Sequence, residues 1–165
     1  MKKVFSITIL TIMLVGILAG CWLGVPTPEV KEGEFDLSVT YEFKGETKTV
    51  SCVYVCEYNG ITWALDGGAH RDWTGYIKDG EIEELIELGT TADGNEITLS
   101  LGLYPEHFMG DPVTGGVEPP APFLSVTVNT EEGFYFLQEP EEIEKLYGAK
   151  ILNYKYEEPI NNTFN

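Results

Sequence analysis

The segment FDLSVTYEFKGETKTVSCVYVCEY, residues 35–58, contains the clearest structural pattern of the 165-residue chain. In its first part, Phe35–Phe43, apolar and aromatic residues alternate with Asp, Ser, Thr and Glu. This period of two is typical of a β-strand with one buried face. Lys44-Gly45 interrupts the alternation and predicts a turn. The β-branched and aromatic residues that follow favour a second strand, paired with the first as a hairpin.

Short runs of similar composition recur along the rest of the chain. Asn59-Gly60 is a typical hairpin-turn dipeptide and predicts a third strand at ITWAL, residues 61–65. Residues 81–88 fit a helix or a strand, and their flanking glycines and short length favour a strand. Further strand-like runs cover residues 74–77, 96–104, 123–128, 134–137 and 151–156.

One segment, residues 140–147, predicts a short helix. Pro140 stands in its first turn, acidic residues follow early, Lys145 comes late, and Gly148 suits the position just after the end. About seven to nine short strands with turns between them are typical of a two-sheet structure. The sequence therefore predicts an all-β, antiparallel, immunoglobulin-like β-sandwich over residues 34–158, followed by a C-terminal tail at residues 159–165.

Cys52 and Cys56 lie four residues apart in the predicted second strand. Four residues of a strand span roughly 13 Å, which exceeds the limit of about 7 Å between the Cα atoms of a disulfide. We therefore expect two unpaired, buried thiols. The alternative is a two-thiol metal or redox pair, although a redox pair has two intervening residues rather than three.

The N-terminal segment has the layout of an export signal. Lys2 and Lys3 precede an uncharged, almost wholly apolar run from Val4 to Gly20, which ends in small residues. A basic start, an apolar middle and a small-residue end are typical of a secretory signal peptide. The apolar run is also at the short edge of the range for a spanning helix, about 20 residues.

The end of this segment, Leu18-Ala19-Gly20-Cys21, resembles the lipobox of bacterial lipoproteins, and the resemblance covers only residues 1–21. It implies that a diacylglyceryl group is joined to the Cys21 sulfur and that residues 1–20 are cleaved off as a signal peptide. The mature protein is then anchored by lipid to the extracytoplasmic face of a cell membrane, since two or three acyl chains hold a protein stably. Beyond the lipobox, the mature chain resembles only uncharacterised bacterial lipoproteins, which implies no activity.

Cleavage would leave 165 less 20, or 145, residues, and would lower the net charge from −17 to −19, because the signal carries two lysines and no acid. Such a surface repels nucleic acid, so no nucleic-acid partner is expected. Residues 21–33 contain Pro26 and Pro28 and predict a flexible tether with a reach of roughly 20–37 Å. An edge strand through Val25 and Val30 is the alternative.

The candidate binding residues are His70, Arg71, Asp72 and Trp73, within a glycine-rich segment, residues 65–75, expected to be a loop between two strands. Arg and Trp are enriched where binding energy concentrates. A ligand site here requires a partly exposed Trp73. The alternative is a structural segment with Trp73 in the core and Arg71 paired with an acid. A second loop, residues 104–116, is expected to form an adjacent wall.

The sequence favours a non-catalytic binding or spacer module, with a protein, peptide or glycan as the possible partner and with no cofactor or metal. It contains no phosphate-binding loop, no nucleophile elbow and no two-histidine metal motif. The alternative is a small hydrolase or metal-dependent enzyme, with His70 as the base beside Asp66 or Asp72. Convergence of these residues with His107 in one pocket would favour the enzyme.

Overall fold

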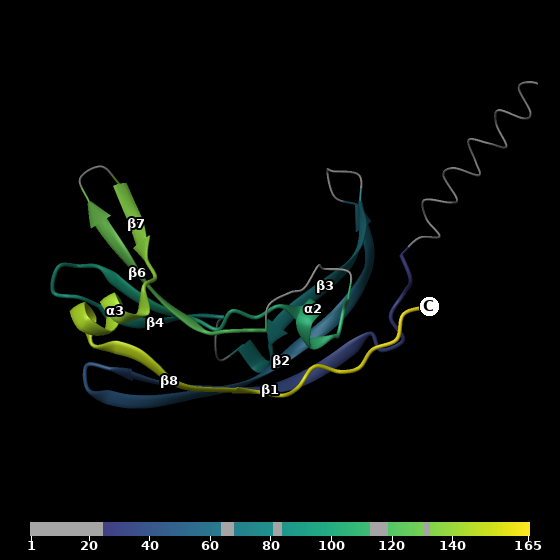
Figure 1. Cartoon of the computed structure of the whole chain (residues 1–165), viewed down its shortest axis with the longest axis horizontal. Helices are drawn as coiled ribbons and strands as arrows, with labels where there is room; N and C mark the ends of the chain where they lie inside the picture. The colour runs from purple at the N-terminus through teal and green to yellow at the C-terminus, as the bar shows by residue number, and fades with distance from the viewer. Residues whose placement is uncertain (1–24, 64–67, 81–83, 113–118, 131–132) are drawn as a thin grey trace, which may run out of the picture.

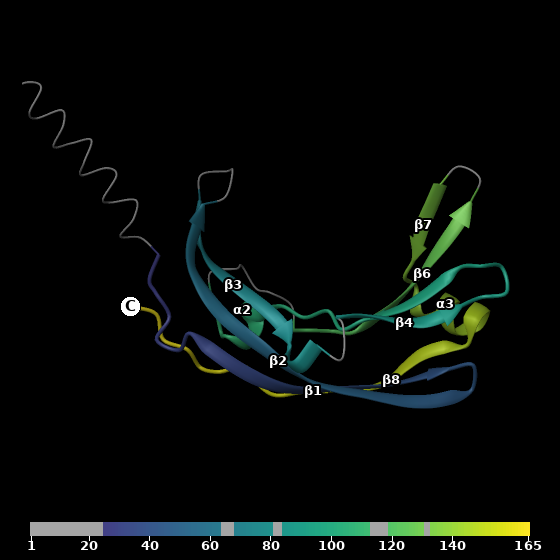
Figure 2. The same cartoon turned by 180° about the vertical axis from the view of Figure 1, so that it is seen from behind.

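The computed structural model describes residues 25–63, 68–80, 84–112, 119–130 and 133–165 (Figure 1). Eight strands form two four-stranded antiparallel sheets, with the strand orders β3-β2-β1-β8 and β4-β5-β6-β7. The two sheets face each other as separate layers (Figures 1 and 2). The predicted all-β sandwich is therefore confirmed.

The first sheet contains β1 (Glu32–Phe43), β2 (Glu46–Trp63), β3 (Ala69–Ile77) and β8 (Ala149–Tyr156). The second sheet contains β4 (Leu85–Thr90), β5 (Glu96–Ser100), β6 (Phe123–Thr130) and β7 (Gly133–Leu137). The second sheet is a simple meander, whereas β8 returns to pair with β1 at the far side of the first. Immunoglobulin domains instead pass strands repeatedly between the two sheets, so the immunoglobulin-like label is not confirmed.

The β1–β2 hairpin agrees with the predicted pattern. The five apolar positions of β1 from Phe35 to Phe43 are all buried, while the residues between them are more exposed. Phe43 is opposite Glu46, so the turn consists of Lys44 and Gly45, with φ values of 52° and 79°. Positive φ at both positions is the requirement of a type I′ turn, which matches the twist of the strands it connects.

The predicted hairpin turn at Asn59-Gly60 is wrong. Strand β2 continues through this dipeptide to Trp63, and its pairing with β3 shifts register between Tyr58 and Gly60. Gly60 has a φ of 120°, and the extra residue makes a β-bulge. Asn-Gly favours positive φ, which suits a bulge as well as a turn. Here β3 pairs with β2 on both sides of the dipeptide, so the dipeptide forms a bulge within the strand.

Three helical segments connect the strands: η1 (Lys78–Gly80), α2 (Pro105–Phe108) and α3 (Pro140–Tyr147). Helix α3 confirms the prediction, and Gly148 follows it in the left-handed conformation, with a φ of 63°. Helix α2 lies in a segment that was expected to be a loop. Among the described residues, no helix is long and apolar enough to cross a membrane.

Strand β4 confirms the strand prediction from Leu85 onward, while residues 81–83 lie outside the described part of the chain. The core between the sheets is formed by apolar residues of β1, β5 and β6, together with residues of α2 and α3. Its largest fully buried side chains include Phe35, Phe108, Leu99 and Ile143.

The two terminal segments pair with each other. The Thr27 amide donates to the Asn165 carbonyl at 2.7 Å, and the Glu29 amide donates to the Thr163 carbonyl at 2.8 Å. Pro26 and Pro28 alternate with these donors, so the missing proline N–H groups cost no hydrogen bond here. The predicted tether therefore needs correction: from residue 26 on it is bound to the domain, as is the predicted tail at 159–165.

Candidate functional site

The predicted binding residues lie on a strand rather than a loop. His70 to Trp73 belong to β3, so alternate side chains point to opposite faces. Arg71 and Trp73 are 2% and 7% exposed, while His70 and Asp72 on the other face are partly exposed. The expectation of a partly exposed Trp73 is wrong, because the period of the strand turns it into the core.

Arg71 is the centre of a buried polar network. Its Nε and Nη2 atoms donate to the Asp111 carboxylate at 2.7 Å each, and both side chains are 1% exposed. The Trp73 indole donates to the same carboxylate at 2.8 Å. Arg71 Nη1 donates to the Pro26 carbonyl at 2.7 Å, and the guanidinium lies 4.2 Å from the Phe164 ring centroid. Four chain segments thus meet at one arginine, which is a structural role.

The two histidines of the enzymatic alternative lie on different elements of the described structure, while His70 and Asp72 share the outer face of β3. His70 lies on β3 opposite Thr62, whereas His107 is on α2 with its ring against Phe108 and Tyr156. Asp66 lies outside the described residues. Neither histidine lines any of four well-formed cavities among the described residues. The described residues also contain no cluster of three or more potential metal ligands.

Both described cysteines are free, as predicted. Cys56 is buried and Cys52 is partly buried. Burial raises the pKa of both thiols, and that of Cys56 reaches about 12 because the nearby Glu106 adds to the effect. The thiolate is the reactive form of cysteine, so both thiols stay protonated and unreactive near neutral pH.

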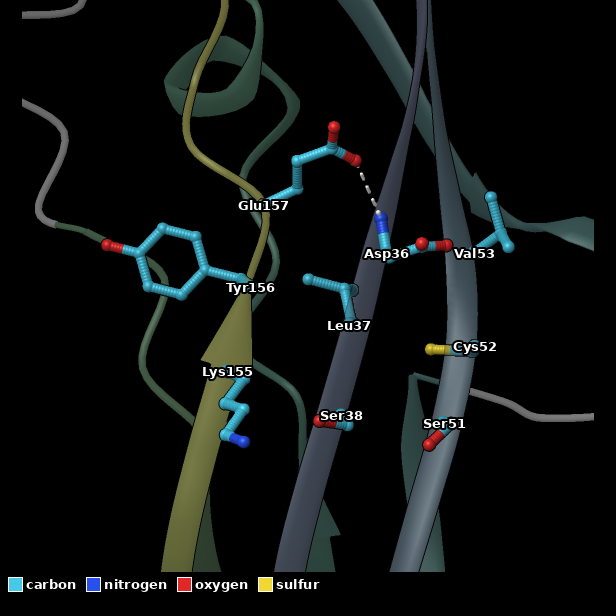
Figure 3. Close-up of a pocket in the computed structure, with 9 residues that line it drawn as sticks. All are labelled: Asp36, Leu37, Ser38, Ser51, Cys52, Val53, Lys155, Tyr156 and Glu157. Atoms are coloured by element: carbon cyan, nitrogen blue, oxygen red, sulfur yellow. Dashed lines mark hydrogen bonds between the residues drawn. The ribbon is translucent and has the colours of Figure 1, made fainter.

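An open groove of about 610 Å³ crosses three neighbouring strands of the first sheet, β8, β1 and β2 (Figure 3). Ser38 of β1 is opposite Ser51 of β2 and opposite Lys155 of β8. Residues opposite each other in a sheet share a face, so these three form one row on the face away from the core. The groove is lined by Asp36, Leu37, Ser38, Ser51, Cys52, Val53, Lys155, Tyr156 and Glu157.

The negative and positive side chains of the groove lie in different parts of it. Asp36 and Glu157 are held together at one end, where the Asp36 amide donates to Glu157 Oε2 at 3.3 Å. Lys155 extends away from Glu157 (Figure 3). In the part of the chain that the structure describes, Lys155 forms no salt bridge, whereas Lys78 and Lys150 each pair with a glutamate. The groove thus combines two hydroxyls, an available ammonium group and two carboxylates.

A second cavity, of about 440 Å³, lies where α3 packs between β6 and β8. Phe123, Ile151 and Tyr154 supply much of its apolar lining, and Glu141 and Glu144 stand at α3. The Tyr154 hydroxyl is buried without a hydrogen-bond partner among the described residues, and burial raises its pKa to about 12. This cavity is a place where a side chain or small apolar group would fit.

A third cavity, of about 290 Å³, lies at the end of the β2–β3 hairpin. None of the described residues that line it is charged: Val25, Thr27, Tyr58, Gly60, Ile61, Trp63 and Ala69.

The described residues therefore define an all-β, two-sheet sandwich with a polar groove on one outer face. The chain matches no protein-family model, and neither the curated proteins nor the solved structures contain a significant match.

Proposed function

We propose that the chain is a lipid-anchored, extracytoplasmic lipoprotein that acts as a non-catalytic binding module for a glycan chain. The lipobox at Cys21 supports the anchoring. The observation that supports binding is the row of Lys155, Ser38 and Ser51 across three strands. It presents two hydroxyls and an ammonium that forms no salt bridge with the described residues.

A glycan suits this groove better than a peptide does. Extended peptides bind to sheets mostly along an exposed edge, where backbone groups are free, and they fill pockets with their side chains. This groove instead lies on the face of the sheet, across β1 and its paired neighbours β2 and β8, rather than along the outer edge of β8. Its hydroxyls, ammonium and carboxylates offer both donors and acceptors, which is what a chain of sugar hydroxyls requires.

Filling the groove tests this proposal. Ser51→Trp places a large ring in the groove, while Thr47→Trp adds the same ring on the same face of β2, outside the groove lining. We expect Ser51→Trp to weaken binding to isolated cell-wall glycan by about tenfold or more, equivalent to about 1.4 kcal/mol. Co-sedimentation of the detergent-purified lipoprotein with this glycan measures the effect.

The control Thr47→Trp is expected to bind as the unmodified protein does. Equal binding by Ser51→Trp, or no binding by the unmodified protein, would argue against the groove as a glycan site.

The anchoring is tested at Cys21. We expect Cys21→Ala to block lipid attachment completely and to leave the precursor or a soluble form, because the sulfur that takes up the lipid is gone. Metabolic labelling with a fatty-acid analogue measures this. Cys52→Ala, which removes a thiol of β2 instead, should keep the label. Label retained on Cys21→Ala would show that the lipid is attached elsewhere or not as proposed.

A further inference from the structure

The uncharged cavity at the end of the β2–β3 hairpin contrasts with the rest of the protein. The chain has 27 acidic residues, yet none of the seven residues that line this cavity carries a charge. Trp63 and Ile61 on its wall are 48% and 38% exposed. Large apolar side chains gathered in an exposed, uncharged hollow are typical of a contact surface.

The β-bulge at Asn59-Gly60 creates this surface. Ile61 is opposite Arg71 and Trp63 is opposite Ala69, so they share the face of β3 that carries the buried residues. Without the extra residue of the bulge, the period of two would place Ile61 and Trp63 on the other face. The bulge thus extends the apolar face of the hairpin beyond the core.

The cavity lies close to the proposed lipid attachment point. Its wall includes Val25, and the next residue, Pro26, is held by Arg71 at 2.7 Å. Val25 is four residues from Cys21, and a chain spans at most about 3.6 Å per residue, or roughly 14 Å over four. The start of the described chain, the C-terminus and the end of the β2–β3 hairpin lie at the same end of the molecule in both views (Figures 1 and 2).

We infer that this end of the domain docks on the bilayer that holds the protein's own lipid anchor, with Trp63 and Ile61 in the interfacial layer. The inference rests on the proposed lipidation of Cys21. Tryptophan prefers the membrane–water interface, where its ring is apolar and its N–H can stay hydrated. The uncharged lining lets this end approach lipid, while the charged side chains elsewhere stay in water. One end of the domain therefore touches the membrane, and the domain is not held away from the membrane on a long tether.

Tryptophan quenching tests the docking in the lipidated, full mature protein. Three variants are reconstituted into phosphatidylcholine vesicles with brominated acyl chains: W22F, W22F/W63F and W22F/W63F/L146W. All three keep Trp73, which is 7% exposed, and Leu146 is 56% exposed on α3 at the opposite end (Figure 1). We expect bromine quenching in W22F, its loss in W22F/W63F, and no recovery in the variant with tryptophan at position 146.

Equal quenching of W22F and W22F/W63F, or quenching that returns with Leu146→Trp, would overturn the docking. Mass analysis of the N-terminal peptide tests the lipidation of Cys21 separately from the docking. If Cys21 carries no lipid, the proposed function and the docking both fail. If Cys21 carries lipid and Trp63 is not quenched, only the docking fails.

Discussion

Arg71→Ala is expected to lower the free energy of unfolding by about 3–5 kcal/mol, because removing one partner of a buried ion pair leaves the other charge buried without compensation. Asp111 would lose both hydrogen bonds from the guanidinium, at 2.7 Å each, and would keep the one from the Trp73 indole, at 2.8 Å. The Pro26 carbonyl would also lose its donor. Urea unfolding followed by tryptophan fluorescence measures the change.

The matched control is Lys48→Ala, which breaks the pair with Glu46, where both side chains are more than half exposed. Exposed pairs contribute little to stability, so this variant should unfold at the same urea concentration as the unmodified protein. A small effect of Arg71→Ala would mean that water readily enters the site and solvates Asp111.

A double change separates the ion pair from simple packing. In R71M/D111L both charges are removed together, so neither remains buried alone. We expect the double variant to lose less free energy of unfolding than R71M and D111L lose together, because residues in contact are energetically coupled. Additive effects would mean that the two side chains act only through their volume.

The same buried network gives Arg71 and Trp73, two of the predicted binding residues, a structural role. If this segment were a binding loop, removal of Arg71 together with Trp73 would abolish ligand capture with little loss of stability. Both side chains are buried, so this double change should unfold the domain. The sequence pattern did contain the correct alternative, in which Trp73 is in the core and Arg71 pairs with an acid.

Local periodicity made much of the fold predictable. The alternation of β1, the Lys44-Gly45 turn and the capping residues of α3 each involve contacts between near neighbours in the chain. Such features depend on backbone preferences that short stretches of sequence carry. For this reason most of the strands, the first hairpin and helix α3 were anticipated, whereas the first part of β3 was expected to be a loop.

Features that depend on distant pairing were not predictable. Asp111 lies 40 residues from Arg71, and no local pattern marks it as the partner. The groove needs β8 beside β1, and the three polar positions that form its central row belong to separate segments: Ser38, Ser51 and Lys155. Each of them looks like an ordinary exposed strand residue, and only the topology brings them together.

The N-terminal segment at residues 26–30 also depends on pairing with a distant part of the chain. Pro26 and Pro28 suggested an extended, unattached segment, since proline interrupts regular pairing. The structure instead pairs the residues between and after the prolines with the C-terminal segment. Where that segment would lie could not be inferred from the N-terminal sequence.

Asn162→Ala is expected to detach this N-terminal segment. Asn162 is 9% exposed, and its side chain bonds both backbone groups of Val30: it accepts from the amide at 3.0 Å and donates to the carbonyl at 2.8 Å. Loss of both bonds should cost about 2 kcal/mol, which corresponds to about thirtyfold faster hydrogen exchange at the Thr27 and Glu29 amides. The exposed Asn161→Ala is the matched control and should leave the exchange rates unchanged.

This substitution also separates anchoring from docking. With residues 25–30 detached, the first fixed residue becomes Lys31, whose carbonyl accepts from the Tyr58 amide, ten residues from Cys21, and the reach of the anchor rises from roughly 14 Å to roughly 36 Å. We expect Asn162→Ala to keep its fatty-acid label and yet to lose bromine quenching of Trp63, because the longer reach no longer holds the hairpin end at the bilayer. Unchanged exchange at Thr27 would show that the backbone bonds to Thr163 and Asn165 hold the segment without the asparagine. Faster exchange with unchanged quenching would show that the apolar surface binds lipid strongly enough without a short tether.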